Sequence, residues 1–223
     1  MAENRFDESR LMFAFVHDLR GYLRTVRTRI QLVQASADSQ LSDRDQSYLR
    51  EADSAAADLH GLTAAMVAYC DAGPTDETIP IGILVRGILL EMKPVLNEAG
   101  ARVTVEGESD VMVPRVLQTV LRELVRNSCR FRREEGETVI TVRLATPDAM
   151  RLQMSVIDNG LGVDSAMLEK IFIPFQRLQS QSTHPGYGLG LSTCRKIVEA
   201  HGGTIVAEAP AGGGLAMHVS IPT

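Results

Sequence analysis

Apolar residues recur at steps of three and four along the first third of the chain, in two stripes separated by a short polar stretch. The stripes comprise Leu11, Phe15, Leu19, Leu23, Val26, Ile30 and Val33, and then Tyr48, Ala52, Ala55, Leu59, Leu62, Met66 and Tyr69. This spacing predicts two long helices, over about residues 6–36 and 43–71, with Ser42 or Asp43 capping the second. They form an antiparallel hairpin. Because a hairpin alone cannot bury both stripes well, we expect two copies to pair as a four-helix bundle in a homodimer.

The segment Gly73-Pro74-Thr75-Asp76-Glu77 breaks the helical pattern and is the expected hinge between two domains, residues 1–73 and 74–223. Beyond the hinge, helical and strand periods alternate. They predict helices over residues 81–99, 114–131, 165–171 and 191–200, and strands over residues 101–106, 138–145, 150–157, 204–208 and 215–221. The predicted class is α+β, a helical hairpin followed by a domain of mixed helices and strands.

Composition narrows the classes of function. The chain is 44% hydrophobic, which suffices for a core, and contains no 18-residue apolar run, so no membrane span is expected. A net charge of −5 argues against a nucleic-acid binder. The first residues lack the pattern of a signal peptide, and Cys70, Cys129 and Cys194 lack metal-ligand spacing. We therefore expect a soluble, cytoplasmic protein with free thiols.

Two glycine clusters mark the second domain. Asp158-Asn159-Gly160-Leu161-Gly162 follows a predicted strand, and Gly186-Tyr187-Gly188-Leu189-Gly190-Leu191 opens a predicted helix. Glycines at such places let backbone N–H groups approach phosphate oxygens, and the helix dipole adds to the attraction. Asp158 can accept a hydrogen bond from the amino group of adenine. The two clusters together predict a nucleotide pocket.

Three polar residues share one face of the predicted helix over residues 114–131. Glu123 and Asn127 are four positions apart, and Arg130 follows after a further turn. The amide oxygen of Asn127 suits Mg²⁺, which binds through few protein groups plus substrate phosphates, and Arg130 can pair with a phosphate. A surface pattern of charges is the alternative interpretation. The glycine clusters favour the nucleotide site.

These segments resemble the conserved boxes of sensor histidine kinases. Residues 123–131 (ELVRNSCRF), 158–162 (DNGLG), 171–175 (IFIPF) and 186–191 (GYGLGL) are similar to their N, first-glycine, phenylalanine and second-glycine boxes, in the same order. Residues 15–20 (FVHDLR) resemble the phosphoacceptor box. The resemblance covers nearly the whole chain and is closest to the kinase modules of bacterial phytochromes. It implies an α/β sandwich of the superfamily that also contains gyrase and heat-shock chaperone ATPases.

The resemblance implies a function for the hairpin. His17 would be phosphorylated from ATP, and Asp18 would orient its ring and take a proton. The phosphoryl group would then pass to an aspartate on the receiver domain of a response regulator, with a sensor domain or protein acting upstream. Gly21 stands where this family's regulator-phosphatases carry Thr or Asn, so little phosphatase activity is expected.

The resemblance also implies roles in the pocket. Asn127, with Glu123 nearby, would hold Mg²⁺; Asp158 would bind the adenine amino group; Arg130 would take the place of a phosphate-facing Lys. The remaining residues implied to shape the ATP site are Phe131, Gly160, Gly162, Phe175, Gly186, Gly188, Leu189 and Gly190. His184, between the phenylalanine and second-glycine boxes, is a further candidate for phosphate contact.

Two other classes remain open. A histidine phosphotransferase or scaffold with an inactive nucleotide site would share this architecture, although the intact pocket residues weigh against it. A plain ATPase of the wider superfamily would explain Glu123, which activates water in gyrase and the chaperones, but leaves the His17 hairpin unexplained. Nucleotide binding and acid-labile, base-stable phosphate on the protein separate these classes.

Overall fold

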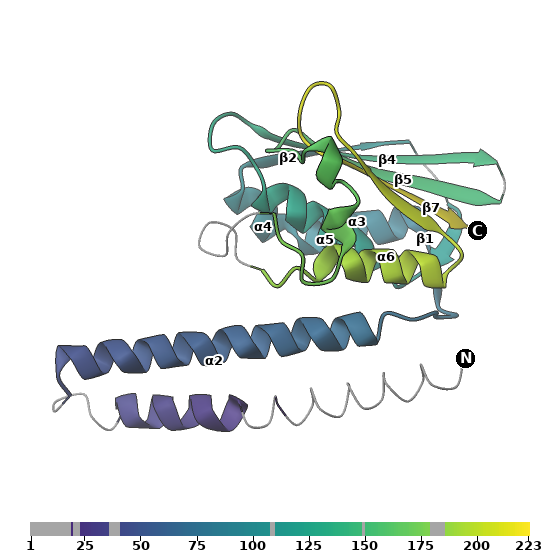
Figure 1. Ribbon diagram of the computed structural model, residues 1–223. Helices are drawn as coiled ribbons and strands as arrows, with labels where there is room; N and C mark the ends of the chain where they lie inside the picture. Colours follow the sequence, from purple (N-terminus) through teal and green to yellow (C-terminus); the bar gives the residue numbers. More distant parts are fainter. Residues whose placement is uncertain (1–18, 20–22, 36–40, 108–109, 149, 179–185) are drawn as a thin grey trace. The chain divides into compact units, whose positions relative to one another are not determined.

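The computed structural model describes the chain except for residues 1–18, 20–22, 36–40, 108–109, 149 and 179–185 (Figure 1). The chain divides into two compact units, Met1–Asp71 and Ala72–Thr223. Within the described ranges, no helix has both the length and the hydropathy of a membrane-spanning segment.

The described part of the first unit contains a helix over residues 23–35 and the helix α2 (Asp43–Cys70), which run antiparallel (Figure 1). Ser42 caps α2, because its hydroxyl accepts a hydrogen bond from the N–H of Asp45 at 3.2 Å. An ion pair between Nε of Arg27 and Oδ1 of Asp53, at 3.0 Å, joins the two helices. The predicted hairpin is therefore confirmed for these residues.

The second unit is built on a five-stranded sheet with strand order β2-β4-β5-β7-β6, in which only the pair β2–β4 is parallel. The strands are β2 (Ala101–Glu106), β4 (Thr138–Asp148), β5 (Arg151–Asp158), β6 (Thr204–Glu208) and β7 (Ala216–Pro222). A small antiparallel ribbon of β1 (Thr78–Pro80) and β3 (Met112–Pro114) precedes the helix that carries the polar residues.

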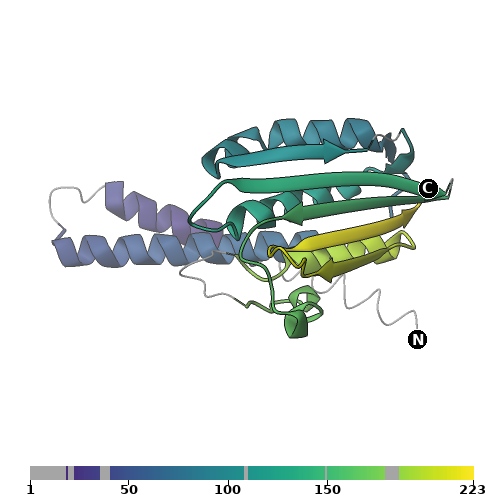
Figure 2. The same cartoon turned by 90° about the horizontal axis from the view of Figure 1, so that it is seen from above.

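Helices cover one face of this sheet, as Figures 1 and 2 show together. They are α3 (Ile81–Glu91), α4 (Lys93–Glu98), α5 (Leu117–Arg130) and α6 (Gly190–Ala200). The core lies between the two layers, because alternate residues of β5 such as Leu152 and Met154 point at the buried stripe of α5, which includes Leu121 and Leu124. The predicted α/β sandwich is thereby confirmed.

Some predicted boundaries are wrong. The helix expected over residues 81–99 is two helices that meet at Met92, with Pro94 in the first turn of α4, where its missing N–H costs nothing. Pro114 ends β3 rather than opening a helix, and α5 begins at Leu117. The segment over residues 165–171 forms two 3₁₀ turns, η1 (Ser165–Met167) and η2 (Lys170–Phe172).

Candidate functional site

The glycine clusters and the polar face of α5 meet at one place in the second unit. A Cβ atom on Gly160 would lie 2.5 Å from the carbonyl oxygen of Phe131, at the end of α5. A Cβ on Gly186 would lie 2.6 Å from Nη1 of Arg130, and one on Gly190 would lie 2.8 Å from Oε2 of Glu123. The structure thus brings both clusters against α5. A side chain at Gly160 would collide with the backbone, and one at Gly186 or Gly190 would require the side chain of Arg130 or Glu123 to move.

Asp158 is the most extensively hydrogen-bonded of the candidate binding groups. Its Oδ1 accepts from the N–H of Gly160 at 2.9 Å and from the N–H of Leu215 at 3.2 Å, and its Oδ2 accepts from the hydroxyl of Ser128 at 2.9 Å. These contacts fix the orientation of a half-buried carboxylate at the end of β5. Ser128 and Leu215 were not predicted, because both contacts join residues far apart in the sequence.

Asn159 has a structural part in the same loop. Its Oδ1 accepts from the N–H of Val139 at 2.9 Å and its Nδ2 donates to the carbonyl of Glu137 at 2.8 Å. The side chain therefore fastens the first glycine cluster to the start of β4. Sequence reasoning quoted Asn159 within the motif but gave it no role.

Two glycines of the site need their backbone freedom. Gly162 has φ 72°, and Gly188 has φ 70°. A Cβ on Gly162 would lie 2.8 Å from the carbonyl oxygen of Gly214, and one on Gly188 would lie 2.9 Å from the backbone of Phe175. Both space and conformation exclude side chains at these positions.

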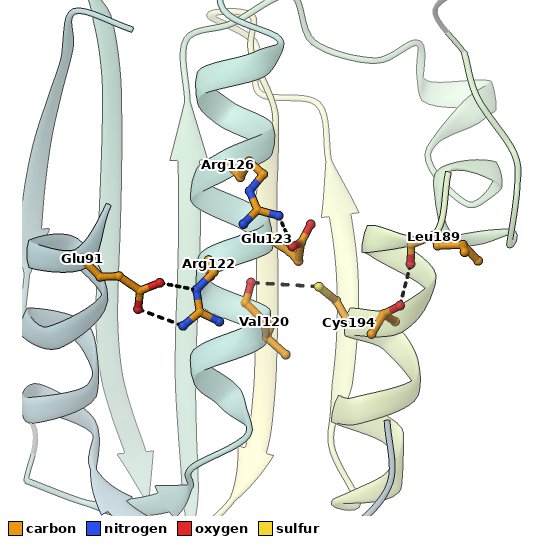
Figure 3. A network of polar contacts seen from close by, with 8 residues as sticks. Glu91, Val120, Arg122, Glu123, Arg126, Leu189 and Cys194 are labelled. Atoms are coloured by element: carbon orange, nitrogen blue, oxygen red, sulfur yellow. Dashed lines mark hydrogen bonds and ion pairs between the residues drawn. The ribbon is translucent and has the colours of Figure 1, made fainter. Parts of the chain in front are cut away.

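The polar face of α5 carries the other candidate ligands. Oε1 of Glu123 pairs with Nη1 of Arg126 at 2.6 Å (Figure 3). The side-chain amide of Asn127 is half-buried and makes no hydrogen bond with any residue that the structure describes.

Arg130 brings positive charge to the site. Burial lowers the pKa of its guanidinium; the nearby Glu123 opposes this, and the positive charges of Arg126 and Arg177 lower the pKa further. Arg130 forms no ion pair with a carboxylate among the described residues. A partly buried cation among other cations favours an anionic ligand such as a phosphate.

The phenylalanine box packs on α6 through Phe172 rather than Phe175. Phe172 is buried, and the guanidinium carbon of Arg195 lies 3.8 Å from the centre of its ring. The same guanidinium forms an ion pair with Glu169, with Nη2 3.0 Å from Oε2. Phe175 is exposed and has φ 64°, a strained conformation for a bulky side chain, with its N–H donating to the carbonyl of Gly188 at 2.8 Å. The backbone of Phe175, and not its side chain, thus contacts the second glycine cluster.

Hydrogen bonds within its own first turn stabilise the start of α6. The carbonyl of Leu189 accepts from the N–H of Thr193 at 2.9 Å and from the hydroxyls of Ser192 and Thr193, at 2.9 and 2.7 Å. Cys194, one residue on, is buried with its sulfur 4.0 Å from the carbonyl of Val120 on α5. Burial raises the pKa of the Cys194 thiol, so this cysteine packs α6 on α5 as an apolar group.

Other predicted residues lie outside the described part of the chain. His17 and Asp18 are among them, as are Gly21 and His184. Every other predicted site residue belongs to the second unit and lies on α5, at the end of β5, or in the segments that lead to α6.

Comparison with known proteins defines the class. Residues 112–223 match the model of the histidine kinase-, DNA gyrase B-, and HSP90-like ATPases, and the chain belongs to this family. It is 27% identical over 216 residues to the phytochrome-like protein Cph1 of Synechocystis, covering 94% of this chain and 29% of Cph1. It is 28% identical over 229 residues to the adaptive-response sensory kinase SasA of a Synechococcus strain, covering 96% of this chain and 59% of SasA. The chain therefore spans less than two thirds of the length of either relative.

Solved structures agree in fold. Full-length ShkA in complex with AMPPNP has a TM-score of 0.73 at 21% identity, covering 96% of this chain and 45% of ShkA. The catalytic domain of histidine kinase ThkA has a TM-score of 0.57 at 27% identity, covering 66% of this chain and 94% of that domain. The resemblance to sensor histidine kinases, phytochrome-type proteins among them, is confirmed.

Proposed function

We propose that this chain is an ATP-dependent protein-histidine kinase that phosphorylates its own His17 and passes the phosphoryl group to an aspartate on a response regulator. Residues 1–73 would form the dimerising phosphoacceptor hairpin and residues 74–223 the ATP-binding domain. One observation carries the proposal: the carboxylate of Asp158 is held by three hydrogen bonds beside Gly160, which approaches the backbone at the end of α5 too closely for any side chain. Family membership and the kinase relatives support it.

ATP would bind with its adenine toward Asp158 and its phosphates toward the start of α6. The oxygens of Asp158 accept hydrogen bonds from their surroundings, and a carboxylate has further lone pairs to accept one from the adenine amino group. At the other end, the positive end of α6 and the guanidinium of Arg130 both favour phosphate oxygens. Phe131, Gly160, Gly162, Phe175, Gly186, Gly188, Leu189 and Gly190 would enclose the nucleotide.

Mg²⁺ would be held by Asn127, with Glu123 one turn away on the same face of α5. The described residues hold no group of three or more acidic, His or Cys side chains suited to a metal. This fits a cation that takes few protein ligands and completes its shell with phosphate oxygens and water. The amide of Asn127, which makes no hydrogen bond with any described residue, would supply one such oxygen, and bound Mg²⁺ would neutralise phosphate charge.

The chemical step would be an in-line phosphoryl transfer. A neutral imidazole nitrogen of His17 has a lone pair that can attack the γ-phosphorus while the bond to the bridging oxygen of ADP breaks. Asp18 would orient the ring and accept its proton. Because such a transfer depends on positioning and charge neutralisation, the polar groups and glycines gathered at α5 and the start of α6 would account for most of what the protein contributes.

Labelling tests the proposal. The full chain is incubated with Mg²⁺ and ATP labelled in the γ-phosphate, and the labelled protein is then treated with acid or base. We expect label that is lost in acid and survives base, and that is absent from His17→Gln. Base-labile label, or label that persists in His17→Gln, would refute the assignment. Release of free phosphate with an unlabelled protein would instead indicate a plain ATPase.

A further inference from the structure

The Glu123 carboxylate forms an ion pair through one oxygen and faces the start of α6 with the other. Oε1 pairs with Nη1 of Arg126 at 2.6 Å, one turn along the same helix (Figure 3). Oε2 faces Gly190, where a Cβ would lie 2.8 Å from it. The carboxylate is thus held between a cation on α5 and the first residue of α6, with 21% of the side chain exposed.

A carboxylate at this place has a chemical consequence, given the proposed function. Glu123 lies one turn before Asn127 and on the same face, close to where the phosphates of ATP would bind. A free carboxylate there can activate water: the water oxygen bonds to the γ-phosphorus, the bond to the bridging oxygen of ADP breaks, and the proton passes to the carboxylate. The products are ADP and inorganic phosphate, and no phosphoryl group reaches a histidine.

We propose that Arg126 is a positioning residue that keeps Glu123 away from water and so directs the phosphoryl group to the protein. The guanidinium occupies Oε1, the oxygen that does not face Gly190, and a strong charge-assisted hydrogen bond at this distance must break before a water can take its place. The inference rests on the proposed function, because it requires ATP at this site. It also explains how an ATPase-type acid is compatible with a kinase.

The neighbouring arginine on α5 provides a matched control. Arg122 makes a two-pronged ion pair with Glu91 of α3, with Nε and Nη2 each 2.9 Å from a carboxylate oxygen (Figure 3). It belongs to the same helix and carries the same charge, but its partner is on α3 and not at the start of α6. Replacing it removes one positive charge and one ion pair without freeing Glu123.

The test measures phosphate release from Mg-ATP by the full chain in a His17→Gln background, so that every released phosphate comes directly from ATP. Arg126→Met should raise the rate at saturating ATP by at least about tenfold, since a general base contributes 10²–10⁴-fold. Arg126→Lys, which retains a cation, should stay near the parent rate. Arg122→Met should also leave the rate unchanged.

A further variant decides whether the carboxylate is responsible. Adding Glu123→Gln to Arg126→Met should return phosphate release to the parent rate, because the amide cannot take the proton. A rate that does not rise in Arg126→Met although ATP still binds would overturn the inference. So would a rise that survives Glu123→Gln, or an equal rise in Arg122→Met.

The proposed function is judged separately, by the acid-labile label on the chain with His17 intact. A carboxylate-dependent rise in a chain that never forms phosphohistidine would support the restraint of Glu123 by Arg126 and refute the kinase. Normal labelling of the chain, together with no effect of Arg126→Met on phosphate release, would support the kinase and overturn the inference about Arg126. A parent chain that binds no ATP in calorimetry contradicts both.

Discussion

Asp158 shows how a single side chain can be fixed for recognition in advance of its ligand. Its carboxylate lies at the end of β5, where backbone N–H groups of Gly160 and Leu215 and the hydroxyl of Ser128 all point at it. Both oxygens therefore act as hydrogen-bond acceptors in a fixed orientation. An acceptor of fixed orientation loses little conformational entropy when it binds an amino group, which favours selective binding of adenine.

Asp158→Asn should weaken Mg-ATP binding by up to about a hundredfold. An amide has one acceptor oxygen where the carboxylate has two, so one of the donors or the adenine amino group loses its partner, at a cost of about 1–3 kcal/mol. Titration calorimetry measures the affinity, and thermal unfolding shows whether the fold is retained. The control is Asp76→Asn, which neutralises an exposed carboxylate before β1. Equal affinities for all three proteins would contradict the adenine assignment.

At the scale of elements, α6 connects the site to the segment that enters the second unit. Its first residue, Gly190, lies against Glu123, and its C-terminal cap is His201. Nε2 of His201 accepts from the N–H of Thr75 at 3.1 Å, while Nδ1 lies 2.8 Å from the carbonyl of Ile197. Since a carbonyl can only accept, Nδ1 is the donor to Ile197, and Nε2 is the acceptor for Thr75.

His201→Ala should lower the free energy of unfolding of the second unit by about 1–3 kcal/mol, because the N–H of Thr75 loses its acceptor in a partly buried place. Chemical denaturation of the full chain, followed by circular dichroism, measures this free energy. The unfolding transition that shifts when nucleotide is added is assigned to the second unit. A variant of His60, which lies on α2 in the first unit, serves as the control. If the transition of the second unit does not move in His201→Ala, the hydrogen bond from Thr75 to His201 contributes nothing to stability.

Hydrophobic periodicity and the positions of the glycines predicted most of the helices and strands. The apolar stripe of α5 placed Glu123 and Asn127 on the opposite, polar face, and the structure has them there.

The sequence could not provide the pairing between distant segments. The β1–β3 ribbon is two three-residue strands, too short to show a period. The contacts of Ser128 with Asp158 and of Asn159 with β4 depend on the register of the sheet. The ion pair of Arg126 with Glu123 is local, and i,i+3 spacing was a signal that could have found it.

At the scale of the whole molecule, the first unit leaves apolar side chains uncovered. Leu23 and Ala56 are buried within the single chain, but Val26 and Leu59 are exposed, at 50% and 43%. A stripe through Leu23 and Val26 was expected to lie between two chains. The structure places Leu23 inside its own hairpin, so Val26 and Leu59 are the better candidates for a surface that a second copy would cover.

Leu59→Glu should convert a dimer of the full chain to monomers, because a charge at an apolar interface without a partner is costly. Light scattering across a range of concentrations measures the mass. Ser54→Glu adds the same charge at an exposed polar position of α2 and should leave the dimer intact. A parent chain that is monomeric throughout, or a Leu59→Glu protein that dimerises as the parent does, would contradict the four-helix bundle.

The central claim is that the phosphoryl group of ATP ends on His17, and the most direct measurement is to locate it. The chain is incubated with Mg-ATP, digested under neutral to basic conditions that preserve phosphohistidine, and sequenced by tandem mass spectrometry. The account predicts a phosphoryl group on His17 that is strongly reduced in Asp158→Asn when ATP is supplied near the dissociation constant of the parent. Phosphate on a different residue, or ATP consumed with none on the protein, would contradict it.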